Sequence, residues 1–179
     1  MQGGDKALIS IAGKPMIEWV IERLRPQVDA VLINANSRDV AAAMSAYTVI
    51  ADSVQGFQGP LAGLHAGMAR ADTAMLACVP CDAPMLPDNL IVHLHRALVE
   101  ASADIAIART AGGLQPTFLL CQCNLQVSIE MFLAQGKRAF HLWLAQQNCI
   151  EVLFSDELAF SNVNTPEDLA RVLALLNTR

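Results

Sequence analysis

The sequence MLACVPCDAP at residues 75–84 decides the fold, because an apolar run stops there at an aspartate between two prolines. The run over 74–79 has the length and composition of a buried strand. Pro80 and Pro84 cannot donate to a sheet ladder, so we expect the strand to end at this point. Asp82 should then lie just beyond the carboxyl end of a central strand, where open α/β sheets bind ligands.

Asp82 has two interpretations. A carboxylate among loops that carry backbone donors is suited to hold a divalent cation against the phosphates of a nucleotide. Alternatively, the aspartate caps amides of its own turn. This motif by itself leaves both interpretations open.

Two further polar side chains follow apolar runs in the same way. Strands are predicted over 28–33 and 48–51, and they are followed by Asn34 and Asp52. The carboxyl ends of parallel strands lie at one edge of a sheet, so these side chains should converge with Asp82. Each alone is typical of a turn, whereas three together favour a site.

Helical patterns alternate with the strands. Apolar spacing, prolines and caps predict helices that start at Pro15, Ser37, Pro60, Pro87 and Thr165, and two more that are separated at Gly136. The Ser37 helix should run to about Ala46 and the Pro60 helix through Arg70, and Asp168 should close a capping box with Thr165. Further strands are predicted over 104–108, 117–120 and 150–154.

Several short motifs could contact an anion. The pair Gly3-Gly4 just before Lys6 lets backbone amides and a cation approach a phosphate. In GPLAG (59–63), free helix amides could meet an anion or a base edge. However, Gly63 and Gly67 are four residues apart, and close helix packing explains them at least as well.

Two more pairs of residues near the C-terminus could face a ligand. Lys137 and Arg138 begin a predicted helix, where cations oppose the helix dipole, so they either serve an anionic ligand or form a solvated pair. Asn162 and Asn164 precede the last helix and are not needed for its cap.

Composition excludes several classes of protein. With 54% apolar and 16% charged residues, the 179-residue chain should fold around a substantial core. The net charge of −5 and the lack of a basic stripe argue against nucleic-acid binding, and no apolar run is long enough for a membrane span. The first residues lack the apolar segment of a signal peptide.

Five cysteines, an odd number, favour a reducing cytoplasm over a disulfide framework. The C-x-x-C and C-x-C pairs make a poor zinc or redox site, since Cys78 lies within the apolar strand.

Taken together, these motifs resemble the molybdenum cofactor guanylyltransferases of the MobA-like NTP transferase family. The matching segments occur in the family's order and cover nearly the whole chain. They are GGDKAL, GKPMIEWV, VLINANSR, VIADS, GPLAGL, PCDAPMLP, QPTFLL and NVNTPEDLA.

The resemblance implies a single nucleotidyltransferase domain over residues 1–179 with a Rossmann-like α/β fold. That fold has three layers, with a mostly parallel central sheet and helices on both faces. The implied reaction transfers GMP from GTP to molybdenum-molybdopterin, which gives the guanine dinucleotide cofactor and pyrophosphate. The implied cofactor is Mg²⁺, with Mn²⁺ as a substitute. Implied protein partners are other enzymes of molybdenum cofactor biosynthesis and acceptor molybdoenzymes.

The resemblance also assigns the site residues. Asp82 would hold the metal and meet the nucleotide, and Lys6 would touch the phosphates; these two are the expected catalytic residues. Asn34 and Asp52 match other GTP contacts of the family, and Gly59, Pro60 and Leu61 would lie beside the base and ribose. The residues expected to face the pterin are Lys137, Arg138, Asn162 and Asn164.

The chain departs from the family pattern at its start. The family begins with an apolar strand and a LAGGxxxRMGG loop, of which residues 1–4 match only the end. We therefore expect an N-terminally truncated domain in which two neighbouring strands lack a partner. The alternatives are a related transferase, such as a molybdopterin cytidylyltransferase, and a catalytically silent protein that binds a nucleotide or a partner.

Overall fold

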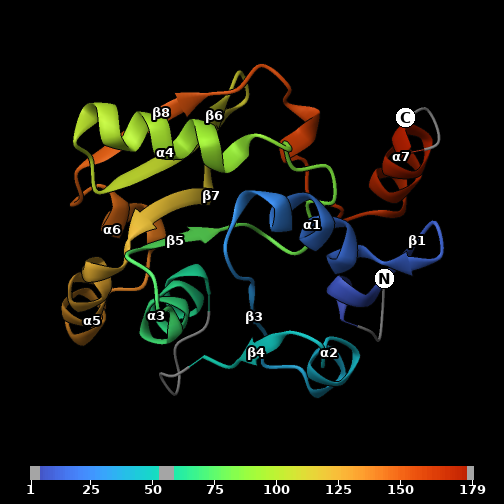
Figure 1. Cartoon of the computed structure of the whole chain (residues 1–179), viewed down its shortest axis with the longest axis horizontal. Coiled ribbons are helices and arrows are strands. Elements are labelled where there is room, and N and C mark those ends of the chain that lie inside the picture. The colour runs from blue at the N-terminus through green and yellow to red at the C-terminus, as the bar shows by residue number, and fades with distance from the viewer. Residues whose placement is uncertain (1–4, 53–58, 177–179) are drawn as a thin grey trace.

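The computed structural model describes residues 5–52 and 59–176 of the chain. The strands of its two main sheets are β3 (Leu32–Asn34), β4 (Thr48–Ile50), β5 (Met75–Cys78), β6 (Ile105–Thr110), β7 (Gly113–Gln122) and β8 (Cys149–Leu153). One sheet has four strands in the order β5-β7-β6-β8, and β3 and β4 form a separate pair (Figure 1). The short strands β1 (Ser10–Ile11) and β2 (Lys14–Pro15) pair with each other.

The predicted helices are all present. The helices are α1 (Met16–Leu24), α2 (Arg38–Ala43), α3 (Pro60–Arg70), α4 (Leu90–Ala101), α5 (Gln126–Ala134), α6 (Phe140–Leu144) and α7 (Pro166–Leu176), with 3-10 turns η1 (Lys6–Leu8), η2 (Arg25–Gln27), η3 (Cys123–Leu125) and η4 (Leu158–Phe160). The Ser37 side chain caps α2 as expected, but α2 ends at Ala43 instead of Ala46. None of the described helices is long and apolar enough to cross a membrane.

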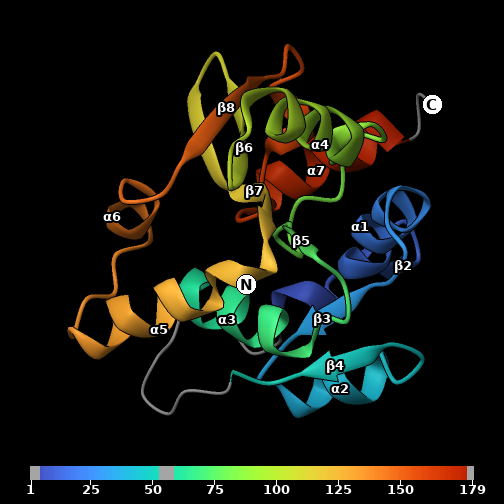
Figure 2. The same cartoon turned by 60° about the vertical axis from the view of Figure 1, so that its left-hand side comes forward.

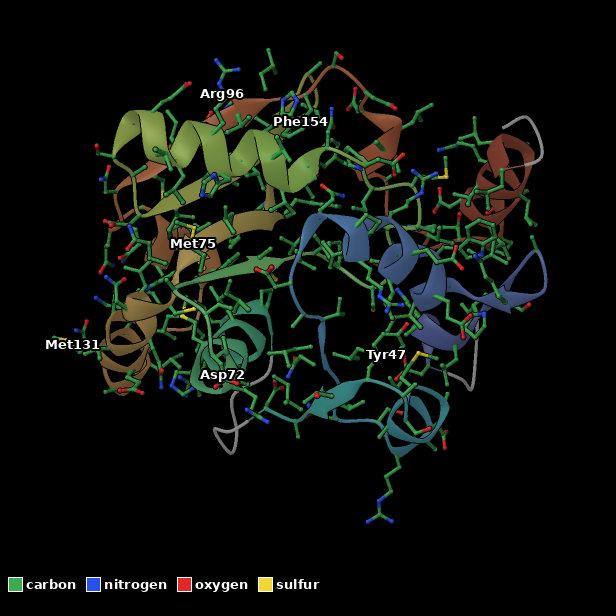
Figure 3. The ribbon with its side chains drawn as sticks, viewed as in Figure 1. Tyr47, Asp72, Met75, Arg96, Met131 and Phe154 are labelled. Atoms are coloured by element: carbon green, nitrogen blue, oxygen red, sulfur yellow. The ribbon has the colours of Figure 1, made fainter. Side chains whose placement is uncertain are left out.

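Helices cover both faces of the four-stranded sheet. Successive side chains of a strand point to opposite faces, and β6 shows this alternation clearly. Ala106 and Ala108 belong to the core beneath α4, whereas Ile105 and Ile107 belong to the core of α3, α5 and α6. Figure 2 shows these two groups of helices on either side of the sheet, and Figure 3 shows Met75 and Phe154, which both pack on the α4 side. The predicted three-layer α/β class is therefore confirmed.

The strand directions differ from a mostly parallel sheet. β6 runs parallel to β8, and β3 runs parallel to β4, but β7 runs antiparallel to both β5 and β6. The reason is local, because Ala111 and Gly112 are the only residues between β6 and β7, and so short a connection makes an antiparallel hairpin. β5 is also not the central, fully buried strand that its composition suggested. It lies at the edge of the four-stranded sheet, and its residues are half-buried.

β3 and β5 each pair on one side within residues 5–52 and 59–176. β3 pairs with β4, and β5 pairs with β7, which is the arrangement expected for two strands that lack a partner. Helix α3 packs against both strands. A Cβ atom added at Gly63 would lie 2.7 Å from Asn34 Oδ1 of β3, and one at Gly67 would lie 2.8 Å from Leu76 Cδ2 of β5. The packing interpretation of these two glycines is therefore confirmed.

A small core joins the beginning and the end of the described chain. It contains buried apolar side chains from the N-terminal hairpin, α1, the segment after β5, the segment before α7, and α7 itself; these are Ile11, Met16, Met85, Val163 and Val172. Figure 1 shows the N-terminal segment beside α7. This core brings residues from both ends of the chain to the segment that carries Asp82.

Candidate functional site

Three of the predicted site residues lie together, and we name Lys6, Asp82 and Asn164 the lysine cluster. Lys6 Nζ donates a hydrogen bond of 2.8 Å to Asn164 Oδ1 across 158 positions of sequence. The backbone N–H of Val163 donates to the backbone oxygen of Asp82 at 2.8 Å, which fixes the two segments side by side. The charge of Lys6 also acts on the Asp82 carboxyl. The cluster thus gathers a cation, a carboxylate and a carboxamide from three segments.

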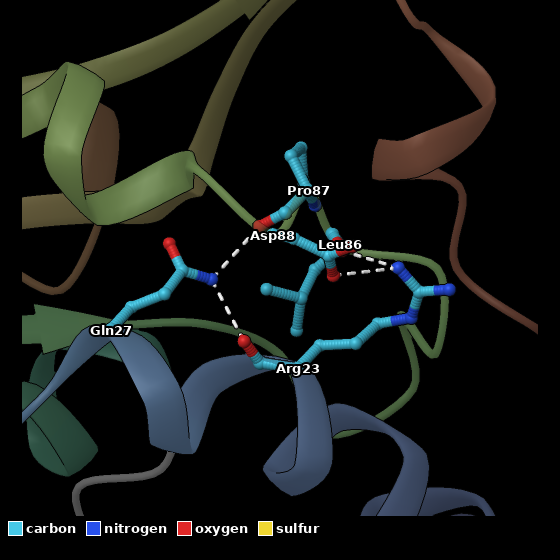
Figure 4. Close-up of polar contacts among 5 residues, drawn as sticks. All are labelled: Arg23, Gln27, Leu86, Pro87 and Asp88. Carbon is cyan, nitrogen blue, oxygen red and sulfur yellow. Dashed lines mark hydrogen bonds and ion pairs between the residues drawn. The ribbon is translucent and has the colours of Figure 1, made fainter.

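Helix α1 and the turn η2 that follows it hold the segment after Asp82 (Figure 4). Gln27 Nε2 donates to the backbone oxygen of Pro87 at 3.0 Å, and Arg23 Nη1 lies 2.9 Å from Asp88 Oδ1. The Arg23 side chain is largely buried, whereas that of Asp88 is exposed. These contacts fix the segment that leads from Asp82 to α4.

Two side chains of this turn, Asp82 and Cys81, have raised pKa values. Partial burial raises the pKa of Asp82 above its usual value, while its own backbone N–H and the Lys6 ammonium oppose that shift. The pKa of the neighbouring Cys81 thiol is raised to about 11 by burial and by the charges of Asp82 and Asp5. Cys81 therefore stays protonated at neutral pH and is a poor nucleophile.

Asp5 is a residue of this region that sequence reasoning missed. Its Oδ1 accepts a hydrogen bond of 3.1 Å from the backbone N–H of Ala7, so it caps η1, whose first residue is Lys6. The signal was present in the sequence, since an aspartate two positions before the short apolar run is typical of an N-cap.

A second group, which we name the amide network, consists of Asn34, Asn36 and Asp52. Asn34 Nδ2 donates to Asp52 Oδ1 at 3.0 Å, and Asn36 Nδ2 donates to Asp52 Oδ2 at 2.8 Å. The backbone N–H of Asp52 donates in return to Asn36 Oδ1 at 3.0 Å. Asn34 and Asp52 therefore meet as predicted, and Asn36 is an additional member. Asp82, the third residue predicted to converge with them, makes no hydrogen bond or ion pair to this group within the described residues.

The amide network lies against the GPLAG segment. Gly63 is in the first turn of α3, and its lack of a Cβ leaves room for the Asn34 carboxamide. Gly59 has φ +116°, a conformation that favours glycine, and it is exposed together with Pro60. Leu61 is buried in the α3 core, unlike Gly59 and Pro60.

The remaining predicted site residues belong to neither the lysine cluster nor the amide network. Lys137 and Arg138 precede α6, which begins at Phe140 instead of at Lys137, and Lys137 Nζ lies 5.6 Å from the centre of the Phe132 ring. Figure 1 places α5 and α6 at the opposite end of the molecule from α7. Asn162 is exposed, and in the sequence it lies two positions before Asn164 of the lysine cluster. Gly3-Gly4 lies outside the described residues.

The lysine cluster and the amide network are separate groups in this structure. Within the described ranges, no hydrogen bond or ion pair joins them. The same part of the chain holds no group of three or more His, Cys, Asp or Glu side chains arranged to bind a metal ion.

Comparisons with known proteins bear on this arrangement. The family model described as the MobA-like NTP transferase domain matches residues 1–149 of this chain. A molybdenum cofactor guanylyltransferase of Shewanella amazonensis is 41% identical over 173 residues, which are 96% of this chain and 88% of that protein. One from Shewanella sp. strain MR-4 is 40% identical over 99% of this chain and 90% of its own.

Solved structures share the fold. The molybdopterin-guanine dinucleotide biosynthesis protein A of Archaeoglobus fulgidus superposes with a TM-score of 0.81 at 23% identity, covering 99% of this chain and 93% of that one. A nucleotidyl transferase of Methanothermobacter thermautotrophicus gives a TM-score of 0.74 at 18% identity, covering 100% of this chain and 88% of its own.

Proposed function

The chain belongs to the MobA-like NTP transferase family, and from that membership we propose that it is a molybdenum cofactor guanylyltransferase. It transfers GMP from GTP to molybdenum-molybdopterin and releases pyrophosphate. Relatives with that name match nearly the full length of the chain at about 40% identity. The two clusters divide the work between the phosphates and the nucleoside of GTP.

The observation that carries this proposal is the hydrogen bond between Lys6 and Asn164 beside Asp82. The phosphate of molybdopterin attacks the α-phosphorus of GTP in line, so the protein need not supply a nucleophile. Negative charge then builds up on the departing pyrophosphate, and a preorganised cation lowers the barrier. Lys6 is that cation, and Asn164 orients its ammonium, which has three donors.

Asp82 fits the role of metal ligand in this reaction. Mg²⁺ is commonly bound by one or two carboxylates together with substrate phosphates, so a single half-buried aspartate is sufficient. Bound Mg²⁺, or Mn²⁺ in its place, would neutralise charge on the phosphates and orient them. Asp82 must be ionised to hold the ion, and Lys6 favours that ionised form.

The amide network is assigned to the nucleoside. Asn34 and Asp52 are fixed beside the first turn of α3, and the exposed Gly59 and Pro60 are the residues there that a base and ribose could reach. The carboxylate of Asp52 can only accept hydrogen bonds. It therefore suits the amino, ring N–H and hydroxyl groups that a guanosine offers.

The pterin contacts rest on Asn162 and Asn164, because these residues adjoin the phosphate-binding lysine. Lys137 and Arg138 lie between α5 and α6, at the opposite end of the molecule from α7, and their part in pterin binding stays a prediction. We place the reaction in the cytoplasm, which the free cysteines favour. Enzymes of cofactor biosynthesis and acceptor molybdoenzymes are the protein partners that fit this role.

Measuring pyrophosphate release with molybdenum-molybdopterin as acceptor tests the proposal directly. GTP, CTP and ATP are supplied singly and in competition, with and without Mg²⁺. We expect metal-dependent release with GTP as the preferred nucleotide. Preference for CTP would identify a cytidylyltransferase instead, and no release with any nucleotide would identify a catalytically silent protein.

A further inference from the structure

We infer that Asn36 is a positioning residue, which holds the Asp52 carboxylate in the orientation that receives the nucleoside of GTP. The inference rests on the proposed function and adds to it a residue that neither the sequence motifs nor the family resemblance assigned. It is carried by the two hydrogen bonds that join Asn36 to both the side chain and the backbone of Asp52.

The backbone places Asn36 opposite Asp52. Pairing of the two strands continues past the end of β3, because the Ala35 N–H donates to the Ile50 oxygen at 2.9 Å. Asn34 and Asn36 are two residues apart on extended chain, so their side chains point to the same side. The Asp52 carboxylate follows the neighbouring parallel strand and lies between these two carboxamides.

The bonds to Asn36 form a closed ring with Asp52. Asn36 Nδ2 donates to Oδ2 of the carboxylate at 2.8 Å, while its Oδ1 accepts from the Asp52 N–H at 3.0 Å. A carboxamide bound at both ends cannot rotate, and it therefore fixes the carboxylate that it touches. Hydrogen bonds to a charged group are stronger than those between neutral groups.

Counting the described residues alone, the fixed carboxylate keeps one accepting position on each oxygen. An ionised carboxylate offers about four lone-pair positions, of which Asn34 takes one on Oδ1 and Asn36 one on Oδ2. Two neighbouring acceptors at a fixed spacing match a ligand that presents two neighbouring donors. The guanine edge, with its ring N–H and amino group, is such a ligand, and so is the ribose diol.

The base and the ribose are distinguished with two analogues of GTP. Inosine triphosphate lacks the amino group of guanine, and 2′-deoxyGTP lacks one hydroxyl of the diol. Whichever donor pair meets Asp52, its loss should cost the wild type affinity but cost an Asn36 variant little, because the variant no longer holds the carboxylate in place.

Two substitutions separate the functions of the side chain. Asn36→Ala removes both hydrogen bonds, whereas Asn36→Asp keeps the acceptor for the Asp52 N–H and replaces the donor with a negative charge. We expect Asn36→Ala to raise the KM for GTP about tenfold and Asn36→Asp to raise it further, with kcat nearly unchanged. Asn124→Ala, which removes an exposed asparagine of η3, is the matched control and should leave both constants unchanged.

The experiment combines steady-state kinetics with equilibrium binding of GTP and thermal melting of each variant. If the wild type prefers GTP but the KM for GTP is unchanged in both variants, the role of Asn36 is overturned and the proposed function is not. A variant that loses kcat, GTP affinity and melting temperature together would show that Asn36 has only a structural role, and this result would also overturn the inference. A wild type that does not bind GTP would refute the proposed function, and the role of Asn36 with it.

Discussion

The lysine cluster and the amide network differ in how they are built. Lys6 and Asn164 meet across 158 positions of sequence, and burial and nearby charge act on Asp82 in opposite directions. Asn34 and Asp52 are 18 positions apart on adjacent parallel strands, and hydrogen bonds fix both oxygens of the carboxylate. The first group depends on the tertiary fold, and the second on the pairing of two strands.

This difference separates two tasks of a transferase. A cation held in place beside the phosphates can offset charge that develops in a transition state. A carboxylate fixed by hydrogen bonds instead presents a fixed shape to a part of the ligand that does not change during the reaction. Substitutions in the lysine cluster should therefore act on kcat, and those in the amide network on KM.

Replacing Asp82 should have the largest effect. Asp82→Ala removes the proposed metal ligand, and we expect kcat to fall about 100- to 1,000-fold because the metal supplies several kcal/mol of transition-state stabilisation. Pyrophosphate release measured over a range of Mg²⁺ concentrations checks this prediction. Thermal melting confirms that the variant folds, and turnover equal to that of the wild type would remove Asp82 from the mechanism.

Replacing Lys6 sharpens the electrostatic side of the comparison. Lys6→Met should lower kcat about 10- to 100-fold. It should also shift the acidic limb of the pH–kcat profile to higher pH, because Lys6 lowers the pKa of Asp82 and Asp82 must be ionised. Asn164→Ala keeps the charge of Lys6 and should reduce kcat with a smaller shift of that limb. An unshifted limb in Lys6→Met would contradict the coupling.

The two glycines of α3 offer a matched test of the amide network. Gly63→Ala places a methyl group against Asn34 and should raise the KM for GTP several-fold. Gly67→Ala places one against Leu76 instead and should lower the melting temperature without changing KM. Overpacking costs about 1–3 kcal/mol, and the gain in helix propensity returns up to about 1 kcal/mol. A KM change in Gly67→Ala but not in Gly63→Ala would reverse the interpretation.

The smallest effect is expected at the start of α7. Asp168 Oδ2 accepts from the Thr165 hydroxyl and from the backbone N–H groups of Asn164 and Thr165, and these bonds lower the pKa of Asp168. Because the folded pKa is depressed, this contribution to stability is present above the ordinary aspartate pKa and is lost as the pH falls through the folded value. Asp168→Asn should therefore melt a few degrees below the wild type at neutral pH, and the difference should vanish on acidification. A difference that is independent of pH would exclude the charge as its cause.

Local signals in the sequence were sufficient for the helices and for half of the site. Prolines, caps and apolar spacing located α3 and α7, and the polar residues after strands located Asn34 and Asp52. Strand directions were harder, because the antiparallel course of β7 depends on a two-residue turn that sequence periodicity does not reveal. The edge position of β5 depends in turn on which strands pair.

Long-range contacts were beyond the sequence signals. Lys6 was expected to meet the phosphates and Asn164 the pterin, and nothing in either motif indicated that the two side chains touch. The ring between Asn36 and Asp52 was missed because asparagines near turns are common. Contacts of this kind depend on tertiary geometry.

The bond between Lys6 and Asn164 has a consequence for the newly made protein. The ribosome synthesises Lys6 long before Asn164, so a nascent chain with its first helices already formed still lacks this hydrogen-bond partner. The pairing forms only after the segment before α7 has emerged from the exit tunnel and docked. Under the proposed function, we therefore expect the phosphate-binding region to be assembled late in synthesis.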